Sequence, residues 1–220
     1  MNDAAGTLLL PGTLCGAELW SGVSLPRGTH VLKTVRGASL SQAAELTLSG
    51  APERFHLVGF SLGALVAFEV LRRAPQRIAR LTLIAANPHA PSSAQLKTWA
   101  EQERAVMDGG FGELVRTLIP AGPQGPTVLD MALRVGPEAF LEQLQLLRSR
   151  PDSRSTLAKY GGPLTVLVGE NDPVTPPHLA GEMKALAPQA QVRVIPDAGH
   201  YLPLDAPQFI SDALKEPAYA

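Results

Sequence analysis

One serine of the chain lies between two glycines, in the stretch Gly59-Phe60-Ser61-Leu62-Gly63. An apolar run precedes this stretch and a second apolar run with small residues follows it, which predicts a buried strand that turns directly into a helix. At such a turn the hydroxyl of Ser61 projects above the edge of the sheet, and the glycines avoid a clash where strand and helix cross. Ser61 is therefore a candidate nucleophile, although Gly and Ser also mark ordinary turns.

A serine nucleophile needs a base and an acid that orients the base, and at a turn of this kind the acid follows the serine and the histidine follows the acid. Asp172 comes just after the apolar run at residues 164–169, and His200 lies in the loop after the last predicted strand, at residues 191–196. Both positions are at the carboxyl ends of predicted strands, where ligands gather in parallel sheets. Asp172 and His200 are thus the candidate acid and base.

Other residues compete for these two roles. Glu170 is the nearest rival acid, and Asp172 could instead cap the helix that follows it. His30 and His56 lie in predicted strands and His178 opens a predicted helix, so we expect these three histidines to be structural.

The elements that must position the candidates alternate along most of the chain. Strands are predicted at residues 7–12, 30–35, 55–60, 80–86, 164–169 and 191–196. Helices are predicted between them and at the end, at residues 40–48, 62–73, 177–186 and 207–214. Four of the strands are nearly unbroken apolar runs, which is typical of parallel strands buried on both faces. This pattern predicts an α/β fold with a mostly parallel six-stranded sheet flanked by helices.

The alternation is interrupted at about residues 87–162, where helical segments follow one another. The first begins with a possible capping box at Ser92 and Gln95. The third is predicted at residues 127–135, and Pro137 opens the fourth. Because connections this long between strands are uncommon without a role, we expect this interval to be a helical cap insertion.

Length and composition indicate a single domain over residues 1–220, because the chain can bury one sizeable core and no change of composition marks a boundary. A net charge of −1 without long like-charge runs argues against a nucleic-acid partner. The single cysteine, Cys15, excludes an intramolecular disulfide. The N-terminal apolar run is too short for a signal peptide or a membrane span, so we expect a cytoplasmic protein without a membrane partner.

Four stretches of sequence surround the candidates: LLLPGTLCGAELW near the start, VGFSLGALVA around Ser61, VLVGENDPVTP around Asp172 and IPDAGHYLPLDAP around His200. Together they resemble the α/β-hydrolase superfamily over essentially the whole chain, in a serine esterase-like branch with a helical cap. The resemblance implies that Ser61 is the nucleophile, His200 the base and Asp172 the acid. It also implies that the backbone N–H groups of Thr13 and Leu62 form the oxyanion hole.

The chain departs from the usual pattern of this superfamily in three ways. Pro11-Gly12 stands where many relatives have His-Gly, the usual two leading strands are missing, and the glycine-rich loop after the second strand is shortened to Val35–Ser39. Asn87 occupies a place where some relatives have their acid, but an amide cannot balance an imidazolium. The expectation therefore remains six strands with Asp172 as the acid.

The resemblance implies an enzyme that hydrolyses a carboxylic ester or thioester of a small-molecule acyl substrate through an acyl-enzyme, with no metal and no organic cofactor. Acyl transfer or hydrolysis of a carbon–carbon bond would use the same residues. Some proteins of this fold bind ligands without catalysis, but here all three positions hold competent residues. Cys15 is a poor alternative nucleophile, because it lies on the oxyanion loop with no paired base.

Apolar residues of the insertion predict a pocket over the candidate site. These residues are Leu96, Trp99, Met107, Leu114, Phe140, Leu144 and Leu147. The charged residues of this region mostly lie outside the apolar faces of these helices, so no cationic cluster that could bind a phosphate or coenzyme A is evident. We expect an apolar pocket of modest size for short to medium acyl chains, with Trp99 and Phe140 as substrate-binding residues. His89 is in loop position to line this pocket or to lie on the surface.

Overall fold

The sheet of the protein consists of parallel strands. The structure is a computed structural model that describes residues 6–119 and 122–215. Within these ranges six strands form one sheet in the order β2-β1-β3-β4-β5-β6, and every neighbouring pair is parallel. The strands are β1 (Gly6–Leu10), β2 (Thr29–Val31), β3 (Phe55–Phe60), β4 (Ile78–Ile84), β5 (Leu164–Gly169) and β6 (Gln191–Ile195). The predicted six-stranded α/β fold is confirmed.

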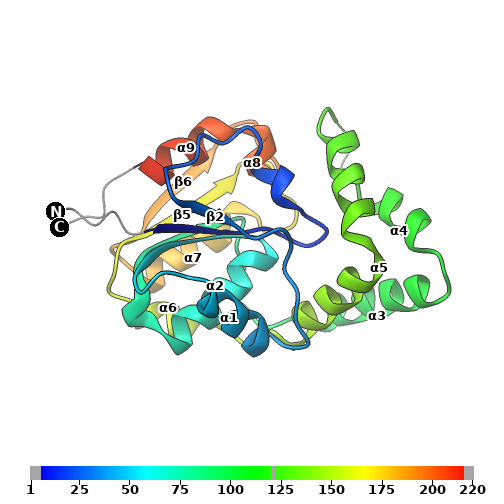
Figure 1. The fold of residues 1–220 in the computed structure, drawn as a ribbon, viewed down its shortest axis with the longest axis horizontal. Helices are drawn as coiled ribbons and strands as arrows, with labels where there is room; N and C mark the ends of the chain where they lie inside the picture. Colours follow the sequence, from blue (N-terminus) through cyan, green and yellow to red (C-terminus); the bar gives the residue numbers. More distant parts are fainter. Residues whose placement is uncertain (1–5, 120–121, 216–220) are drawn as a thin grey trace.

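Helices cover both faces of this sheet (Figure 1). One buried core contains residues of α1 (Leu40–Ser49), α2 (Leu62–Arg73), α6 (Arg154–Ala158) and α7 (Pro177–Leu186). The core on the other face contains residues of the short turn η1 (Ala17–Trp20), α8 (Leu202–Asp205) and α9 (Pro207–Lys215). A second short turn, η2 (Pro75–Arg77), leads into β4. Because both faces are covered, every residue of β3 and β5 is buried, as their apolar sequences predict.

The edge strand β2 is shorter than the strand predicted at residues 30–35. Its pairing with β1 ends with the hydrogen bond from Leu32 N to Leu9 O, at 2.9 Å. After Leu32, the chain contacts the long helix α5 (Gly125–Ser149), where the side-chain amide of Gln143 donates to Thr34 Oγ1 and to Val35 O, at 3.1 Å each. A side chain of the insertion thus satisfies the backbone carbonyl of Val35, which a neighbouring strand could otherwise do.

The described part of the insertion between β4 and β5 is helical: α3 (Ser93–Met107), α4 (Phe111–Leu118), α5 and α6. Ser92 and Gln95 form the predicted capping box at the start of α3. The helices predicted at residues 127–135 and after Pro137 are one element, α5, which kinks at Gly136. Gly136 has a φ of 80°, which glycine adopts readily, and Pro137 cannot donate a helical hydrogen bond.

Helices α3, α4 and α5 pack on one another at one end of the molecule, beside the sheet rather than on its faces (Figure 1). Their shared core contains Val106, Val115, Phe140 and Leu144, together with Leu14 from the loop after β1. Helix α6, which the sequence did not predict, packs against α2 and α7 instead. Across residues 6–119 and 122–215, no helix combines the length and the apolar character needed to cross a membrane.

Candidate active site

Ser61 occupies a sharp turn between β3 and α2. Its backbone has φ 51° and ψ −110°, a conformation that non-glycine residues rarely adopt. A Cβ atom on Gly59 would lie 2.5 Å from the carbonyl oxygen of Gly63, and one on Gly63 would lie 2.2 Å from that of Leu10. Both positions therefore require glycine, because β1, β3 and α2 cross at distances that leave no room for a side chain.

His200 connects Ser61 to a buried carboxylate. Its Nε2 lies 3.1 Å from Ser61 Oγ, and its Nδ1 lies 2.8 Å from Asp172 Oδ2. An ionised carboxylate accepts hydrogen bonds but does not donate them, so Nδ1 must carry the proton. The lone pair of Nε2 then faces the hydroxyl of Ser61, which is the arrangement that a general base requires.

The carboxylate of Asp172 is held in place by a turn of its own chain. Oδ1 accepts from the N–H groups of Val174 and Thr175, at 2.8 and 2.9 Å, and Oδ2 accepts from the Thr175 hydroxyl at 2.6 Å. Burial raises the pKa of Asp172, but the hydrogen bonds from His200 and Thr175 lower it by more, so the net pKa is below its usual range. Asp172 thus stays ionised at neutral pH and faces His200 as an anion.

The rival residues lie elsewhere. Glu170 is exposed and accepts a long hydrogen bond of 3.4 Å from Asp197 N. His56 is buried and lies 2.8 Å from Thr82 Oγ1, and burial lowers its pKa to about 3. Burial raises the pKa of the Cys15 thiol to about 12, so it remains protonated and poorly nucleophilic. Within the described residues, no group of three or more His, Cys, Asp or Glu side chains could hold a metal ion.

Two backbone N–H groups beside Ser61 are free to bind an anion. Leu62 is the first residue of α2, where N–H groups have no partner within the helix. Thr13 lies in the loop after β1. In the described part of the chain neither N–H group donates to an acceptor, and both residues line the same cavity as Ser61. This arrangement suits a negatively charged oxygen in front of Ser61.

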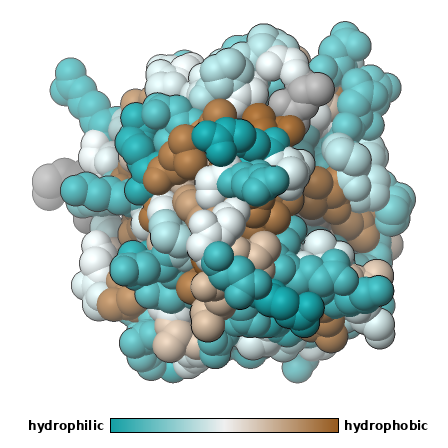
Figure 2. Space-filling model, turned by 90° about the vertical axis from the view of Figure 1, so that its right-hand side faces the viewer, coloured by the Kyte–Doolittle hydropathy of each residue, from teal (hydrophilic) through white to brown (hydrophobic). Residues whose placement is uncertain are grey.

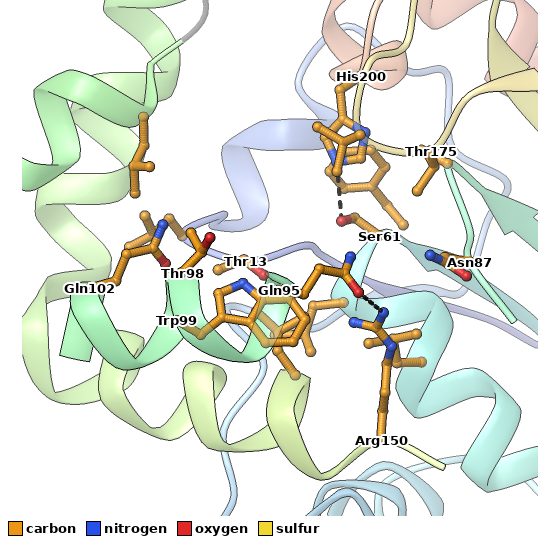
Figure 3. A pocket seen from close by; sticks show the side chains of 18 of the residues that line it. Thr13, Ser61, Asn87, Gln95, Thr98, Trp99, Gln102, Arg150, Thr175 and His200 are labelled. Atoms are coloured by element: carbon orange, nitrogen blue, oxygen red, sulfur yellow. Dashed lines mark hydrogen bonds between the residues drawn. The ribbon is translucent and has the colours of Figure 1, made fainter. Parts of the chain in front are cut away.

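The cavity in front of Ser61 has a volume of about 410 Å³ and lies between the sheet and the insertion. Figure 3 shows Ser61 and His200 on one side of it and Gln95, Trp99 and Gln102 of α3 on another. Seen from outside, the end of the molecule near the insertion has apolar residues set among polar ones (Figure 2). The lining residues are Thr13, Leu14, Phe60, Ser61, Leu62, Leu65, Ala85, Asn87, Gln95, Thr98, Trp99, Gln102, Leu118, Phe140, Leu147, Arg150, Val174, Thr175, His200 and Tyr201.

Residues 8–213 match the Alpha/beta hydrolase family. The chain belongs to this family. This α/β-hydrolase is 28% identical to the pimeloyl-[acyl-carrier protein] methyl ester esterase of Photobacterium profundum, with 98% of this chain and 90% of that protein covered. It is 30% identical to the biotin biosynthesis bifunctional protein of Cellvibrio japonicus, over 86% of this chain but 39% of that protein, so it spans less than half of that relative's length.

A solved structure also resembles this α/β-hydrolase. The structure of a thermophilic esterase from Thermogutta terrifontis has a TM-score of 0.81 at 24% identity, with 96% of this chain and 88% of that chain covered. At this identity the likeness supports the fold alone. The family match and the relatives with esterase names together show that the chain is an α/β-hydrolase of the esterase type.

In this α/β-hydrolase, Gln143 fixes the loop that contains Thr13. Its Oε1 accepts from Leu14 N at 2.9 Å, while its amide nitrogen binds the segment after β2. Leu14 has a φ of 56°, and Gln143 is fully buried. The role of Gln143 is not evident from the sequence, because a glutamine on an amphipathic helix is usually exposed. Its spacing from Phe140 and Leu147 nevertheless places it on the apolar face of the helix, unlike Gln145.

Of the three residues expected to bind substrate, Trp99 and Phe140 line the cavity and His89 does not. The Nε2 atom of His89 lies 2.7 Å from Glu182 on α7, so its ring is turned away toward that helix. His89 does lie in the loop after β4, as predicted, but Glu182, which orients its ring, comes from a distant part of the chain.

The cavity is also more polar than the sequence predicts. Gln95, Thr98, Trp99 and Gln102 share the face of α3 that lines it. Leu96 and Met107, expected on a buried stripe, are 39% and 73% exposed. They lie on an adjacent face of α3, which is more exposed to solvent.

Arg150 adds a cation to this lining. It follows the last residue of α5, directly before Pro151, and is buried. The burial of Arg150 could not be predicted from the sequence, since it depends on how the end of α5 meets α3.

Proposed function

We propose that this chain is a serine hydrolase that cleaves a carboxylic ester or thioester of a small acyl substrate through an acyl-enzyme. The observation that supports this best is the continuous series of hydrogen bonds from Asp172 through His200 to Ser61, on the wall of a cavity of about 410 Å³. The esterase names of relatives such as the Photobacterium profundum protein favour an ester as the scissile bond.

In the first half of the reaction Ser61 Oγ attacks the carbonyl carbon and transfers its proton to His200 Nε2. The N–H groups of Thr13 and Leu62 stabilise the negative charge that develops on the carbonyl oxygen. The tetrahedral intermediate then collapses, the bond to the leaving group breaks, and His200 gives its proton to that alcohol or thiol. Asp172 keeps the imidazole oriented and stabilises its positive charge in the intermediate.

In the second half, water attacks the acyl-enzyme while His200 accepts a proton from it. Collapse of this intermediate releases the carboxylic acid and returns the proton to Ser61 Oγ. The reaction consumes one water molecule and uses the side chains and backbone groups already described.

We further propose that residues 1–220 form a single domain in which the helical insertion, at about residues 87–162, acts as a cap over the reacting bond. The lining of the cavity supports this, because residues of α3, α4 and α5 face Ser61 and His200 across it. A covered site excludes bulk water and lets the cap select the acyl group.

The test is hydrolysis of a panel of p-nitrophenyl esters, methyl esters and acyl thioesters by the purified protein and by two variants. Ser61→Ala removes the nucleophile and is expected to lower kcat by at least about 10³-fold. Ser49→Ala, an exposed serine at the end of α1, is the matched control and should behave as wild type. Full activity in Ser61→Ala would rule out the proposal.

A further inference from the structure

Arg150 is a buried cation whose partners are all neutral. It is 5% exposed, its Nε donates to His89 O, and its Nη2 donates to Gln95 Oε1, both at 2.9 Å. Among the described residues no carboxylate lies within ion-pair distance of it. Burying a charge without a counter-ion is costly, so arginines inside proteins are normally paired.

Its neighbour Arg148 follows that norm. Both terminal nitrogens of Arg148 bind the carboxylate of Glu103 on α3, at 2.6 Å. The two arginines are two residues apart at the same end of α5, and both reach α3. They differ in that Arg150 lines the cavity and Arg148 does not. The arginine that lacks an anionic partner is therefore the one that a substrate can reach.

The guanidinium of Arg150 is held in a fixed position. Its central carbon lies 5.2 Å from the centroid of the Trp99 ring, and two of its N–H groups are anchored by Gln95 and the His89 carbonyl. Its Nη1 donates to no acceptor in the described part of the chain. Burial lowers the pKa of Arg150 to about 10, which leaves it charged at neutral pH. Figure 3 shows the guanidinium beside Gln95 and Trp99, on the side of the cavity away from His200.

We propose that Arg150 binds a free carboxylate at the far end of the acyl chain, so that the preferred substrates are monoesters of short dicarboxylic acids. This inference rests on the proposed function and names its substrate class. A planar guanidinium binds a carboxylate well through parallel hydrogen bonds. The apolar lining from Leu65, Phe140 and Leu147 suits the methylene groups between the two ends.

The lining favours a carboxylate over a phosphate. Arg150 is the one arginine among the lining residues that the structure describes, and no lysine joins it. A phosphate monoester carries up to two negative charges and is usually bound by several basic groups or backbone N–H groups. A carboxylate carries one charge, which Arg150 alone neutralises.

The test compares monomethyl glutarate and monomethyl adipate with the corresponding methyl ester monoamides, which have the same length and no charge. The measured quantity is the ratio of kcat/KM for the acid to kcat/KM for the amide. We expect a ratio of at least about 10 in wild type, falling about 10- to 100-fold in Arg150→Met, since a hydrogen bond to a charged group is lost. Arg150→Lys should keep part of the preference, because it retains the charge but not the planar fork.

Arg148→Met is the matched control, because it removes the neighbouring arginine that Glu103 already neutralises; its ratio should equal that of wild type. A ratio near one in wild type, or the same ratio in Arg150→Met as in wild type, would overturn the inference. Arg150→Lys keeps the test valid if the methionine variant does not fold.

Binding measured without turnover separates this inference from the proposed function. Monomethyl adipate is titrated calorimetrically into Ser61→Ala and into the double variant Ser61→Ala/Arg150→Met. We expect at least about tenfold tighter binding to the single variant. If this difference is found but the wild type hydrolyses no ester, the proposed function fails and the carboxylate site stands. If neutral esters are hydrolysed at Ser61 but the two variants bind equally, the carboxylate site fails and the proposed function stands.

Discussion

The two sides of the cavity hold their polar groups by different means. On the sheet side, Ser61 directly follows β3, and Asp172 and His200 lie in the loops after β5 and β6, so the ends of the strands bring the three hydrogen-bonded side chains together. On the insertion side, Gln143 lies on the kinked helix α5 behind the cavity lining, and Arg150 lines the cavity just past the end of that helix; contacts with distant segments orient both side chains.

This difference bears on what each side can do. A turn between a buried strand and a helix tolerates little change, because neighbouring backbones leave no room for a Cβ atom on Gly59 or Gly63. A helix face can exchange one side chain for another at small cost to the fold. We therefore expect changes on the sheet side to abolish the reaction, and changes on the insertion side to alter its rate or its substrate preference.

The largest expected fall in kcat comes from a change to Asp172, next to His200, and the neighbouring acid Glu170 serves as its control. Asp172→Asn should lower kcat by about 10³- to 10⁴-fold, because an amide does not hold the required tautomer of His200 or stabilise its charge. Glu170→Gln, two residues away and exposed, should change kcat by less than about threefold, as surface substitutions away from the chemistry do. Steady-state kinetics on one ester compares the two. The opposite ranking would move the acid to Glu170.

An intermediate effect is expected where the insertion supports the sheet side. Gln143→Leu removes the acceptor of Leu14 N and should shift the loop that holds Thr13, lowering kcat about 10- to 100-fold with KM changed less. The exposed Gln145→Leu on the same helix is the control. Thermal unfolding is followed in parallel, and assays are run well below the transition. If kcat falls equally in Gln143→Leu and Gln145→Leu, Gln143 has no special role at the oxyanion loop. If Gln143→Leu lowers the stability of the protein but not the kcat of the folded enzyme, Gln143 contributes to packing alone.

The smallest expected effect is on the insertion side itself. Trp99→Ala should raise kcat/KM for neutral p-nitrophenyl esters with longer acyl chains several-fold relative to shorter ones, because one extra methylene in an apolar pocket contributes about 1 kcal/mol. Leu96→Ala, on an adjacent and exposed face of α3, is the control and should leave the length profile as in wild type. If Trp99→Ala also leaves the profile unchanged, α3 does not limit the acyl chain.

The same division explains what the sequence predicted. Strands such as β3 and β5 were predicted from unbroken apolar runs, and Ser61 from its glycines, because these signals are local. Asp172 and His200 were predicted as candidates because they come after predicted strands, which is also a local signal. The short β2, the neutral setting of Arg150 and the pairing of His89 with Glu182 depend on contacts between segments far apart in the chain. No local pattern records such contacts.

The central claim is that Ser61 is the nucleophile, and covalent labelling tests it most directly. A fluorophosphonate should react with Ser61 Oγ, releasing fluoride while His200 takes the proton, and mass spectrometry should find one adduct, on the peptide that contains Ser61. Labelling should be lost in Ser61→Ala and strongly slowed in His200→Ala. An adduct on another serine, or labelling of Ser61→Ala at the wild-type rate, would contradict the account.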